Sequence, residues 1–231
     1  TPDAYLVAMT AAIEAYQALK PRMRGWLHAG AVPAAVIAGL VLILLAPAEL
    51  RWAAIIYVVS TVALFGISAT YHRGTWGPRT HGVLKRMDHA TIFIFIAGTY
   101  TPIALTVVGG TAGTVLLWIV WLAALAGVIF RVFWVGAPRW LIVPVYISMG
   151  WAAVFFIPEI LSNGGTAIFL LIAVGGLCYS VGAVIYGLKR PDPSPKWFGF
   201  HEIFHSFTLG GYVSHYVGIC LAIFGVGVIA H

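Results

Sequence analysis

Long apolar stretches, separated by short polar or glycine-rich segments, dominate this chain. A helix needs about 20 predominantly apolar residues to cross the hydrocarbon core of a bilayer. The sequence has seven stretches of roughly that length. They span residues 27–46, 52–71, 88–108, 113–132, 140–157, 166–188 and 201–230. This pattern predicts an all-α protein, a seven-transmembrane helix bundle.

The segment before the first apolar stretch has a different pattern. Between positions 6 and 16 apolar residues recur at helical spacing, and Pro21 follows. This predicts a short amphipathic N-terminal helix that lies on the membrane surface and ends before the proline. We therefore divide the chain into an interfacial segment, residues 1–24, and a seven-transmembrane domain, residues 25–231. No internal repeat and no separate soluble domain is apparent.

Composition makes a membrane environment necessary. Of the 231 residues, 61% are hydrophobic and only 9% are charged. A soluble fold of this size could not bury so much apolar surface, and the sequence lacks the polar groups to cover it. The composition excludes a nucleic-acid binder, a disulfide-stapled secreted domain and a disordered regulator. Cys178 and Cys220 lie within apolar runs, so we interpret them as packing residues.

Basic residues predict the orientation in the membrane, because loops rich in Lys and Arg stay in the cytoplasm. Twelve of the 13 basic residues fall in one alternating set of loops, and only Arg51 falls in the other. The predicted N-terminus is therefore cytoplasmic and the C-terminus lies outside, in a multi-pass protein of the cell membrane. The net charge of +6 is explained by this topology and by anionic headgroups, with membrane lipids as the expected partners.

Candidate chemistry gathers at the predicted cytoplasmic ends of three stretches. Ionisable groups inside a bilayer are costly, so those near span ends mark candidate sites. Ser68 and His72 end the second stretch, Asp88 begins the third, and His201 and His205 begin the last. The i,i+4 spacing places His201 and His205 on one side of a helix. The topology thus predicts that three histidines, one aspartate and one serine converge in one layer of the membrane.

Three neutral imidazoles form a recognised zinc-binding set that leaves a fourth tetrahedral position open for water. His72, His201 and His205 are the candidate ligands of Zn²⁺. Asp88 could hold the metal-bound water, act as a general base or orient a ligand. Ser68 could hydrogen-bond a substrate carbonyl or the water.

Simpler interpretations exist for each of these residues. A single histidine at a membrane interface often only reaches towards headgroups. Asp88 could cap the third helix, and Ser68 could bond back to its own helix. The sequence from His201 to His205 also matches the His-Glu-x-x-His pattern of metalloproteases. We favour a headgroup-level position for Glu202 instead, because it points away from His201.

Two other polar residues have separate expectations. Arg131, at the predicted cytoplasmic end of the fourth stretch, is expected to anchor the helix by extending its side chain to the membrane surface. His215 lies ten positions beyond His205, roughly 15 Å deeper, and so cannot join the same metal. It is either a hydrogen-bonded residue of the bundle or part of a proton path.

Three motifs together resemble the hemolysin III branch of the progestin and adiponectin receptor superfamily. They are Ser-Ala-Thr-Tyr-His ending at His72, Met-Asp-His-Ala around Asp88, and His-Glu-Ile-Phe-His from His201 to His205. The resemblance implies a zinc site near the cytoplasmic face, with the three histidines as ligands. It further implies that Asp88 reaches the metal through water and that Ser68 is a near neighbour.

The leading functional hypothesis is a zinc-dependent hydrolase of a lipid amide or ester. The resemblance implies ceramidase-like chemistry and a role in membrane homeostasis. Asp88 and Ser68 are the expected catalytic residues, and the lipid substrate is expected in a cavity of the bundle. Two alternatives remain. One is a receptor-like, non-enzymatic regulator of membrane state with structural zinc, and the other is a pore-forming (haemolytic) or proton-coupled transport protein.

Overall fold

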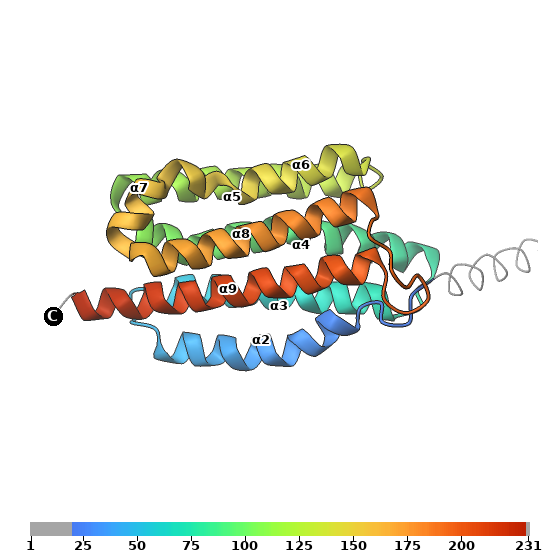
Figure 1. The fold of residues 1–231 in the computed structure, drawn as a ribbon, viewed down its shortest axis with the longest axis horizontal. Coiled ribbons are helices and arrows are strands. Elements are labelled where there is room, and N and C mark those ends of the chain that lie inside the picture. The colour runs from blue at the N-terminus through green and yellow to red at the C-terminus, as the bar shows by residue number, and fades with distance from the viewer. Residues whose placement is uncertain (1–19, 230–231) are drawn as a thin grey trace, which may run out of the picture.

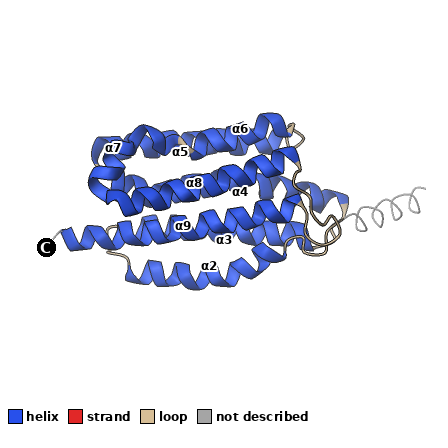
Figure 2. Ribbon diagram, viewed as in Figure 1, coloured by secondary structure: helices blue, strands red, loops and turns tan. Residues whose placement is uncertain are grey.

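The fold is a bundle of long helices that run up and down along a common direction (Figures 1 and 2). A computed structural model describes residues 20–229. Apart from an isolated bridge between Ser194 and Phe198, that part of the chain contains no β-structure. The helical elements are α2 (Trp26–Leu45), α3 (Arg51–Arg73), α4 (Pro78–Ile103), η1 (Ala104–Val108), α5 (Gly110–Phe133), α6 (Arg139–Gly150), η2 (Ala152–Phe156), α7 (Ile157–Glu159), η3 (Ile160–Gly164), α8 (Gly165–Leu188) and α9 (Phe200–Ile229). The all-α class is confirmed.

Six helical segments of residues 20–229 are long and apolar enough to cross a membrane. One of them, Arg139–Leu188, is 50 residues long and contains α6, α7 and α8. In Figure 1, α6 and α7 lead away from the end where α9 begins, and α8 runs back beside them. The amphipathic helix expected before Pro21 falls on residues outside the described range.

The third helix begins ten residues earlier than its apolar stretch suggested. α4 begins at Pro78 rather than near Asp88, with the proline in its first turn. Proline suits that position because its fixed φ matches the helix and its missing N–H is not needed there. The early turns carry Arg79, Lys85 and Arg86. Because these residues are charged, the hydrophobic pattern does not predict this part of the helix. Asp88 is therefore an interior residue of α4, and the interpretation of Asp88 as a helix cap is wrong.

The expected fifth stretch, residues 140–157, is not a single regular helix. It contains Pro144, and α6 ends at Gly150, where η2 and then α7 take over. Such a break frees backbone groups that need hydrogen-bond partners inside a membrane. Tyr100 supplies them, since its hydroxyl donates to the Gly150 carbonyl (2.6 Å) and accepts from the Ala153 N–H (2.9 Å).

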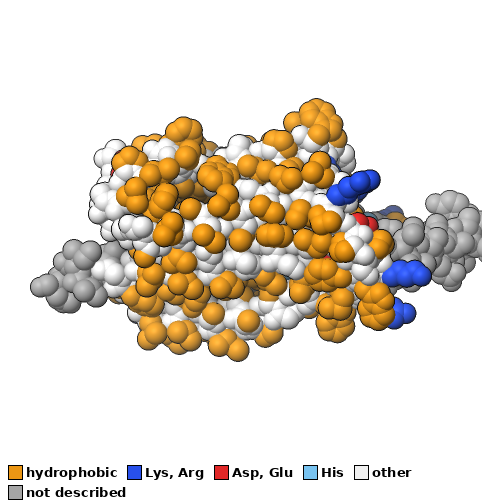
Figure 3. All heavy atoms as spheres, viewed as in Figure 1, with side chains coloured by type: hydrophobic (Ala, Val, Ile, Leu, Met, Phe, Trp, Pro, Cys, Tyr) orange, Lys and Arg blue, Asp and Glu red, His pale blue; other side chains and the backbone are white. Residues whose placement is uncertain are grey.

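α4 is the central element of the bundle. Within Pro78–Val108, which contains α4, 72% of an apolar stretch of 18 residues is buried. The corresponding share is 22% for α2 and 17% for the segment that contains α6 to α8. The outer helices expose large apolar side chains along their length, among them Ile37, Leu44, Trp118 and Phe133. Figure 3 shows such side chains spread over the visible face of the bundle. This surface suits lipid rather than water as its surroundings.

One end of the bundle, which we call the basic end, carries most of the Lys and Arg side chains seen in Figure 3. α2, α4, α6 and α9 begin there, and α3, α5 and α8 end there (Figure 1). The Arg22 N–H donates to the Lys196 carbonyl (2.9 Å), which joins the segment before α2 to the segment before α9. Gly25 precedes α2 with φ of 79°, and a Cβ there would lie 2.8 Å from the Cβ of His72. Glycine thus lets α2 begin directly against α3.

Candidate metal centre and cavity

Three histidines from two helices converge at the basic end. His72 lies in the last turn of α3, and His201 and His205 lie one turn apart at the start of α9. Their candidate ligand nitrogens all lie within 4.8 Å of one another. The side chains are buried, with exposed fractions of 8%, 9% and 3% in the order given. The structure therefore brings together the three residues that the sequence selected, across 129 positions of chain between His72 and His201.

The spacing of these nitrogens fits a metal ion. Nε2 of His72 lies 3.2 Å from Nε2 of His201. With Zn–N bonds of about 2.0–2.1 Å, two ligands of a tetrahedral ion are separated by about 3.3 Å. The ring centroids of His201 and His205 are 4.5 Å apart at an angle of 60°, so the rings converge rather than stack. Three buried imidazoles in this arrangement could hold a divalent metal.

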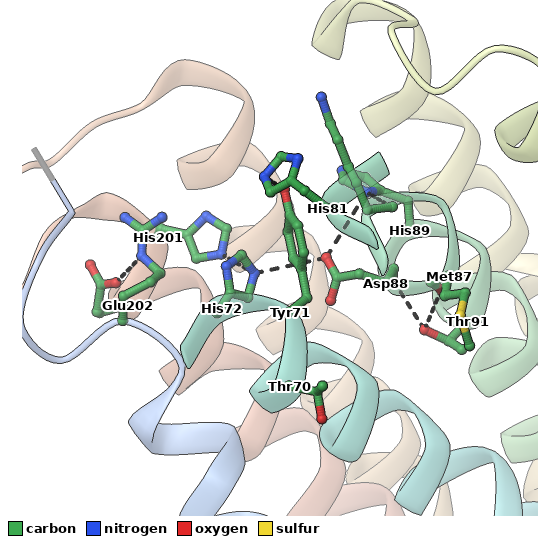
Figure 4. A network of polar contacts seen from close by, with 12 residues as sticks. Thr70, Tyr71, His72, His81, Met87, Asp88, His89, Thr91, His201 and Glu202 are labelled. Atoms are coloured by element: carbon green, nitrogen blue, oxygen red, sulfur yellow. Dashed lines mark hydrogen bonds and ion pairs between the residues drawn. The ribbon is translucent and has the colours of Figure 1, made fainter. Parts of the chain in front are cut away.

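Asp88 lies beside the histidines (Figure 4). Its Oδ2 is 3.8 Å from Nε2 of His72 and 3.9 Å from Nδ1 of His89. Ser68, one turn before His72 on α3, is buried and lines the same cavity as Asp88. α4 thus brings the carboxylate to the cluster, and α3 supplies both a histidine of the cluster and a hydroxyl in the same cavity wall.

His28 is a fourth histidine of this region, and no motif in the sequence pairs it with the other three. It lies in the first turn of α2 and is 3% exposed. Its ring stacks on that of His205 with centroids 3.8 Å apart and an angle of 9°. Neither ring nitrogen of His28 has a hydrogen-bond partner among the described residues. Its position at the same end of a span as His201 was the sequence signal that could have identified it.

Glu202 is not at headgroup level as expected, because its side chain is only 1% exposed. It forms an ion pair with Arg24, and its Oε2 accepts a hydrogen bond from the Gly199 N–H (2.8 Å). The counter-charge on the segment before α2 is what allows the carboxylate to be buried. Glu202 therefore ties the beginning of α9 to the beginning of α2.

The remaining histidines within residues 20–229 do not belong to the group of three that could hold a metal. His81 contacts the Tyr71 hydroxyl (3.4 Å), and His89 Nδ1 lies 2.7 Å from the Lys85 carbonyl oxygen. His215 Nε2 lies 3.0 Å from the Ile172 carbonyl oxygen, which agrees with the expectation of a hydrogen-bonded residue of the bundle.

A cavity of about 450 Å³ lies next to the cluster. Ser68, His72, Asp88, His201 and His205 form part of its wall. Further along α4 the wall is mixed, with apolar side chains at residues 92, 95, 96 and 103 and the hydroxyl-bearing Thr99 and Tyr100 among them. From Asp88 to residue 103 the helix rises roughly 22 Å, so the cavity extends far from the polar cluster into the bundle.

Comparisons with known proteins agree with the motifs of this site. A model of the family described as haemolysin-III related matches residues 16–216. The chain belongs to the haemolysin-III related family. A hemolysin-3 homolog of Bacillus subtilis is 37% identical over 156 residues, which cover 68% of this chain and 70% of the relative. Hemolysin-3 of Bacillus cereus is 34% identical over 68% of each chain.

The family extends to animals. Human monocyte to macrophage differentiation factor is 26% identical over 171 residues, covering 71% of this chain and 67% of the relative. These findings confirm the resemblance to the hemolysin III branch of the progestin and adiponectin receptor superfamily. They also support a multi-pass membrane protein. The six apolar helical segments of this haemolysin-III related chain point to the same conclusion.

Proposed function

We propose that this protein is a zinc-dependent hydrolase that cleaves an amide or ester bond of a membrane lipid. The observation that carries the proposal is the convergence of three buried histidines with a carboxylate, at one end of a cavity that extends into the bundle. A role in membrane homeostasis follows from a lipid substrate of this kind.

The proposed topology has seven spans, a cytoplasmic N-terminus, an external C-terminus and the site near the cytoplasmic face of the cell membrane. In support, the 50 residues from Arg139 to Leu188 exceed the roughly 20 needed for one crossing. α6 with α7 would cross outward and α8 would return. The basic end would face the cytoplasm, because Lys and Arg accumulate on that side.

Each residue of the proposed site has a role that follows from its position. His72, His201 and His205 would hold the zinc ion. Zinc in a site of three histidines supplies a Lewis acid and a water nucleophile that is available at neutral pH. Asp88, 3.8 Å from His72, would accept the proton of the attacking water and return it to the leaving amine or alcohol. Ser68 would hold the Asp88 carboxylate in place or donate to the substrate carbonyl.

The cavity wall supports a lipid as the substrate. Charged and polar groups line the end that contains Asp88, and the part further into the bundle is lined mainly by apolar side chains of α4, together with Thr99, Tyr100 and His215. An acyl chain in the apolar part would bring the bond next to the carbonyl towards the histidines. Binding sites for small molecules commonly combine a mostly apolar wall with a few positioned polar groups in this way.

The test compares turnover by two variants of the purified protein in lipid nanodiscs. Asp88→Asn keeps the size of the side chain but removes the base. We expect it to retain zinc and to lose about 10²-fold to 10⁴-fold in hydrolysis of a ceramide or ester-lipid panel. The matched control is Glu49→Gln, an exposed carboxylate in the loop before α3, which should leave turnover unchanged. Equal turnover by Asp88→Asn and the natural protein would contradict the proposed role of Asp88.

A second function is favoured by how the histidines connect the helices. The cluster joins the end of α3 to the start of α9, and His28 adds the start of α2 through its stack on His205. In this alternative, zinc would serve only to fasten these helices in a non-enzymatic regulator of membrane state. Chelation would then lower the unfolding temperature, and no lipid of the panel would be cleaved under any condition.

A further inference from the structure

His215 and Tyr179 form a second polar pair in the cavity wall, away from the metal cluster. His215 lies in α9 ten residues beyond His205, roughly 15 Å further along the helix axis. Tyr179 lies in α8, and the centroids of the two rings are 5.2 Å apart at an angle of 72°. Both side chains line the cavity. The proposed hydrolysis uses neither of them.

Each of the two rings fits against a glycine of the facing helix. Gly175 of α8 leaves the space that the His215 ring occupies. Gly211 of α9 does the same for Tyr179, since a Cβ there would lie 2.6 Å from Cε1 of the tyrosine ring. Carbon atoms in contact are about 3.5–4.0 Å apart, so only glycine allows this approach. The two rings are therefore held in place where α8 packs on α9.

The pair has one hydrogen-bond donor and one acceptor that are not used. Nε2 of His215 lies 3.0 Å from the Ile172 carbonyl oxygen. Because a carbonyl oxygen only accepts, Nε2 of the neutral ring carries the proton, and Nδ1 is an acceptor. Nδ1 and the Tyr179 hydroxyl are both buried without a partner among the described residues.

Other hydroxyl groups of the cavity wall differ from that of Tyr179. Four of them donate to backbone carbonyl oxygens, those of Thr99, Tyr100, Ser180 and Thr208. Their hydrogen-bonding needs are met within the bundle. A buried donor or acceptor without a partner costs free energy. The unused groups of Tyr179 and His215 therefore favour a ligand that satisfies both.

A hydroxyl group is the ligand chemistry that matches this pair. It donates and accepts at once, so it can donate to Nδ1 of His215 and accept from the Tyr179 hydroxyl. A carboxylate has only acceptors and leaves Nδ1 without a partner. An ammonium group has only donors and leaves the tyrosine hydroxyl without one.

We propose that Tyr179 and His215 bind a hydroxyl group on the acyl chain of the substrate, and so make the protein selective for hydroxylated lipids. With the cleaved bond at the histidine cluster, roughly 15 Å corresponds to about twelve carbon atoms of an extended chain with bonds of about 1.5 Å. The inference rests on the proposed function for the position of the chain, but the binding itself requires no hydrolysis. Water has the same hydrogen-bonding chemistry, and the test separates the two sources.

The test measures binding of methyl ketones with an 18-carbon chain to the purified protein in lipid nanodiscs, with empty nanodiscs as the blank. A ketone in place of the amide or ester leaves no bond to hydrolyse. One analogue has no hydroxyl, one has it at the twelfth carbon and one at the fifth. We expect the analogue hydroxylated at the twelfth carbon to bind roughly tenfold more tightly than the other two, because it forms two hydrogen bonds with groups that otherwise lack partners.

Substitutions locate this preference. Tyr179→Phe and His215→Phe each remove one of the two groups and keep an aromatic ring, and each should reduce the preference to about threefold or less. Tyr216→Phe is the matched control and should keep the full preference, because that hydroxyl donates to the Ala38 carbonyl (2.8 Å) and does not line the cavity. If His215→Phe fails to fold, Tyr179→Phe decides, since it removes only a hydroxyl that has no partner among the described residues.

Three results would overturn the inference. They are equal binding of all three analogues, which would leave water as the occupant, a preference that does not depend on the position of the hydroxyl, and an unchanged preference in Tyr179→Phe. Failure here and failure of the proposed hydrolysis are distinguishable. Lipid hydrolysis without the preference would remove the hydroxyl site alone, whereas the preference without hydrolysis of any lipid would remove the enzyme alone.

Discussion

The two halves of α9 use the same residue type in different ways. At the basic end, His201 and His205 converge on His72, with Asp88 beside them. Ten residues further along the same helix, His215 is also within the bundle, but Nε2 contacts the Ile172 carbonyl oxygen and its ring packs on Tyr179. Its Nδ1 has no partner among the described residues. A position within the bundle therefore does not by itself bring a histidine into a cluster that could hold a metal.

The difference lies in what the neighbouring helices contribute. At the basic end α3 provides a third imidazole and α4 a carboxylate, so several polar groups face one point. Around His215, α8 contributes Gly175, which makes room for the ring, and a backbone carbonyl that satisfies one nitrogen. The first arrangement is suited to hold a cation, and the second is suited to neutralise a polar group inside the bundle.

The largest expected effect comes from substituting one histidine in each half of α9 and comparing the zinc content of the two variants. His205→Ala removes one of the three proposed ligands. It should lower zinc affinity by more than about 100-fold, because losing a ligand costs more than losing a group that only orients a ligand. His215→Phe keeps an aromatic ring and should leave zinc content unchanged. Metal analysis of both purified variants checks the prediction. Zinc loss from His215→Phe with retention by His205→Ala would reverse the assignment.

The next effect concerns how the start of α9 is held. Glu202→Ala leaves the largely buried Arg24 without its counter-charge and the Gly199 N–H without its acceptor. We expect the free energy of unfolding to fall by on the order of 3 kcal/mol, measured by denaturation in mixed micelles. Glu49→Ala, in an exposed loop, should change it by less than about 0.5 kcal/mol. A loss of the same size in both variants would argue against the ion pair.

The smallest effect concerns the stacked ring of His28. His28→Ala removes the surface against which the His205 ring lies and should weaken zinc binding about tenfold, as expected for a group that orients a ligand. His28→Phe preserves the stack and should retain most of the affinity. Competition with a zinc-sensitive chelating dye provides the measurement. Equal losses from both substitutions would mean that a nitrogen of His28, rather than its ring, matters.

Much of the candidate site could be predicted because depth along a helix is readable from sequence. The spacing of His201 and His205, and the position of His72 at the end of a preceding span, were enough to bring the three together. The direction in which a side chain faces was harder to infer. Glu202 and Arg131 were placed at the membrane surface because charges near span ends usually reach it, yet both face inward.

The helix boundaries show a similar limit. Hydrophobicity indicated the apolar part of α4 but not the ten residues from Pro78 to Met87, since basic side chains interrupt the apolar pattern there. It also suggested one fifth span where the chain passes from α6 through η2 and α7. The hydroxyl of Tyr100, 50 residues away from Gly150, satisfies the broken backbone, and no local pattern could reveal that contact.

The proposed chemistry depends on His72, His201 and His205 binding one zinc ion together. X-ray absorption spectroscopy at the zinc edge, on the natural protein purified without added metal, tests it most directly. We expect about one zinc per chain, surrounded by three imidazole nitrogens at about 2.0–2.1 Å and an oxygen ligand. A protein without zinc, or a zinc shell that contains sulfur or fewer than three imidazoles, would contradict it.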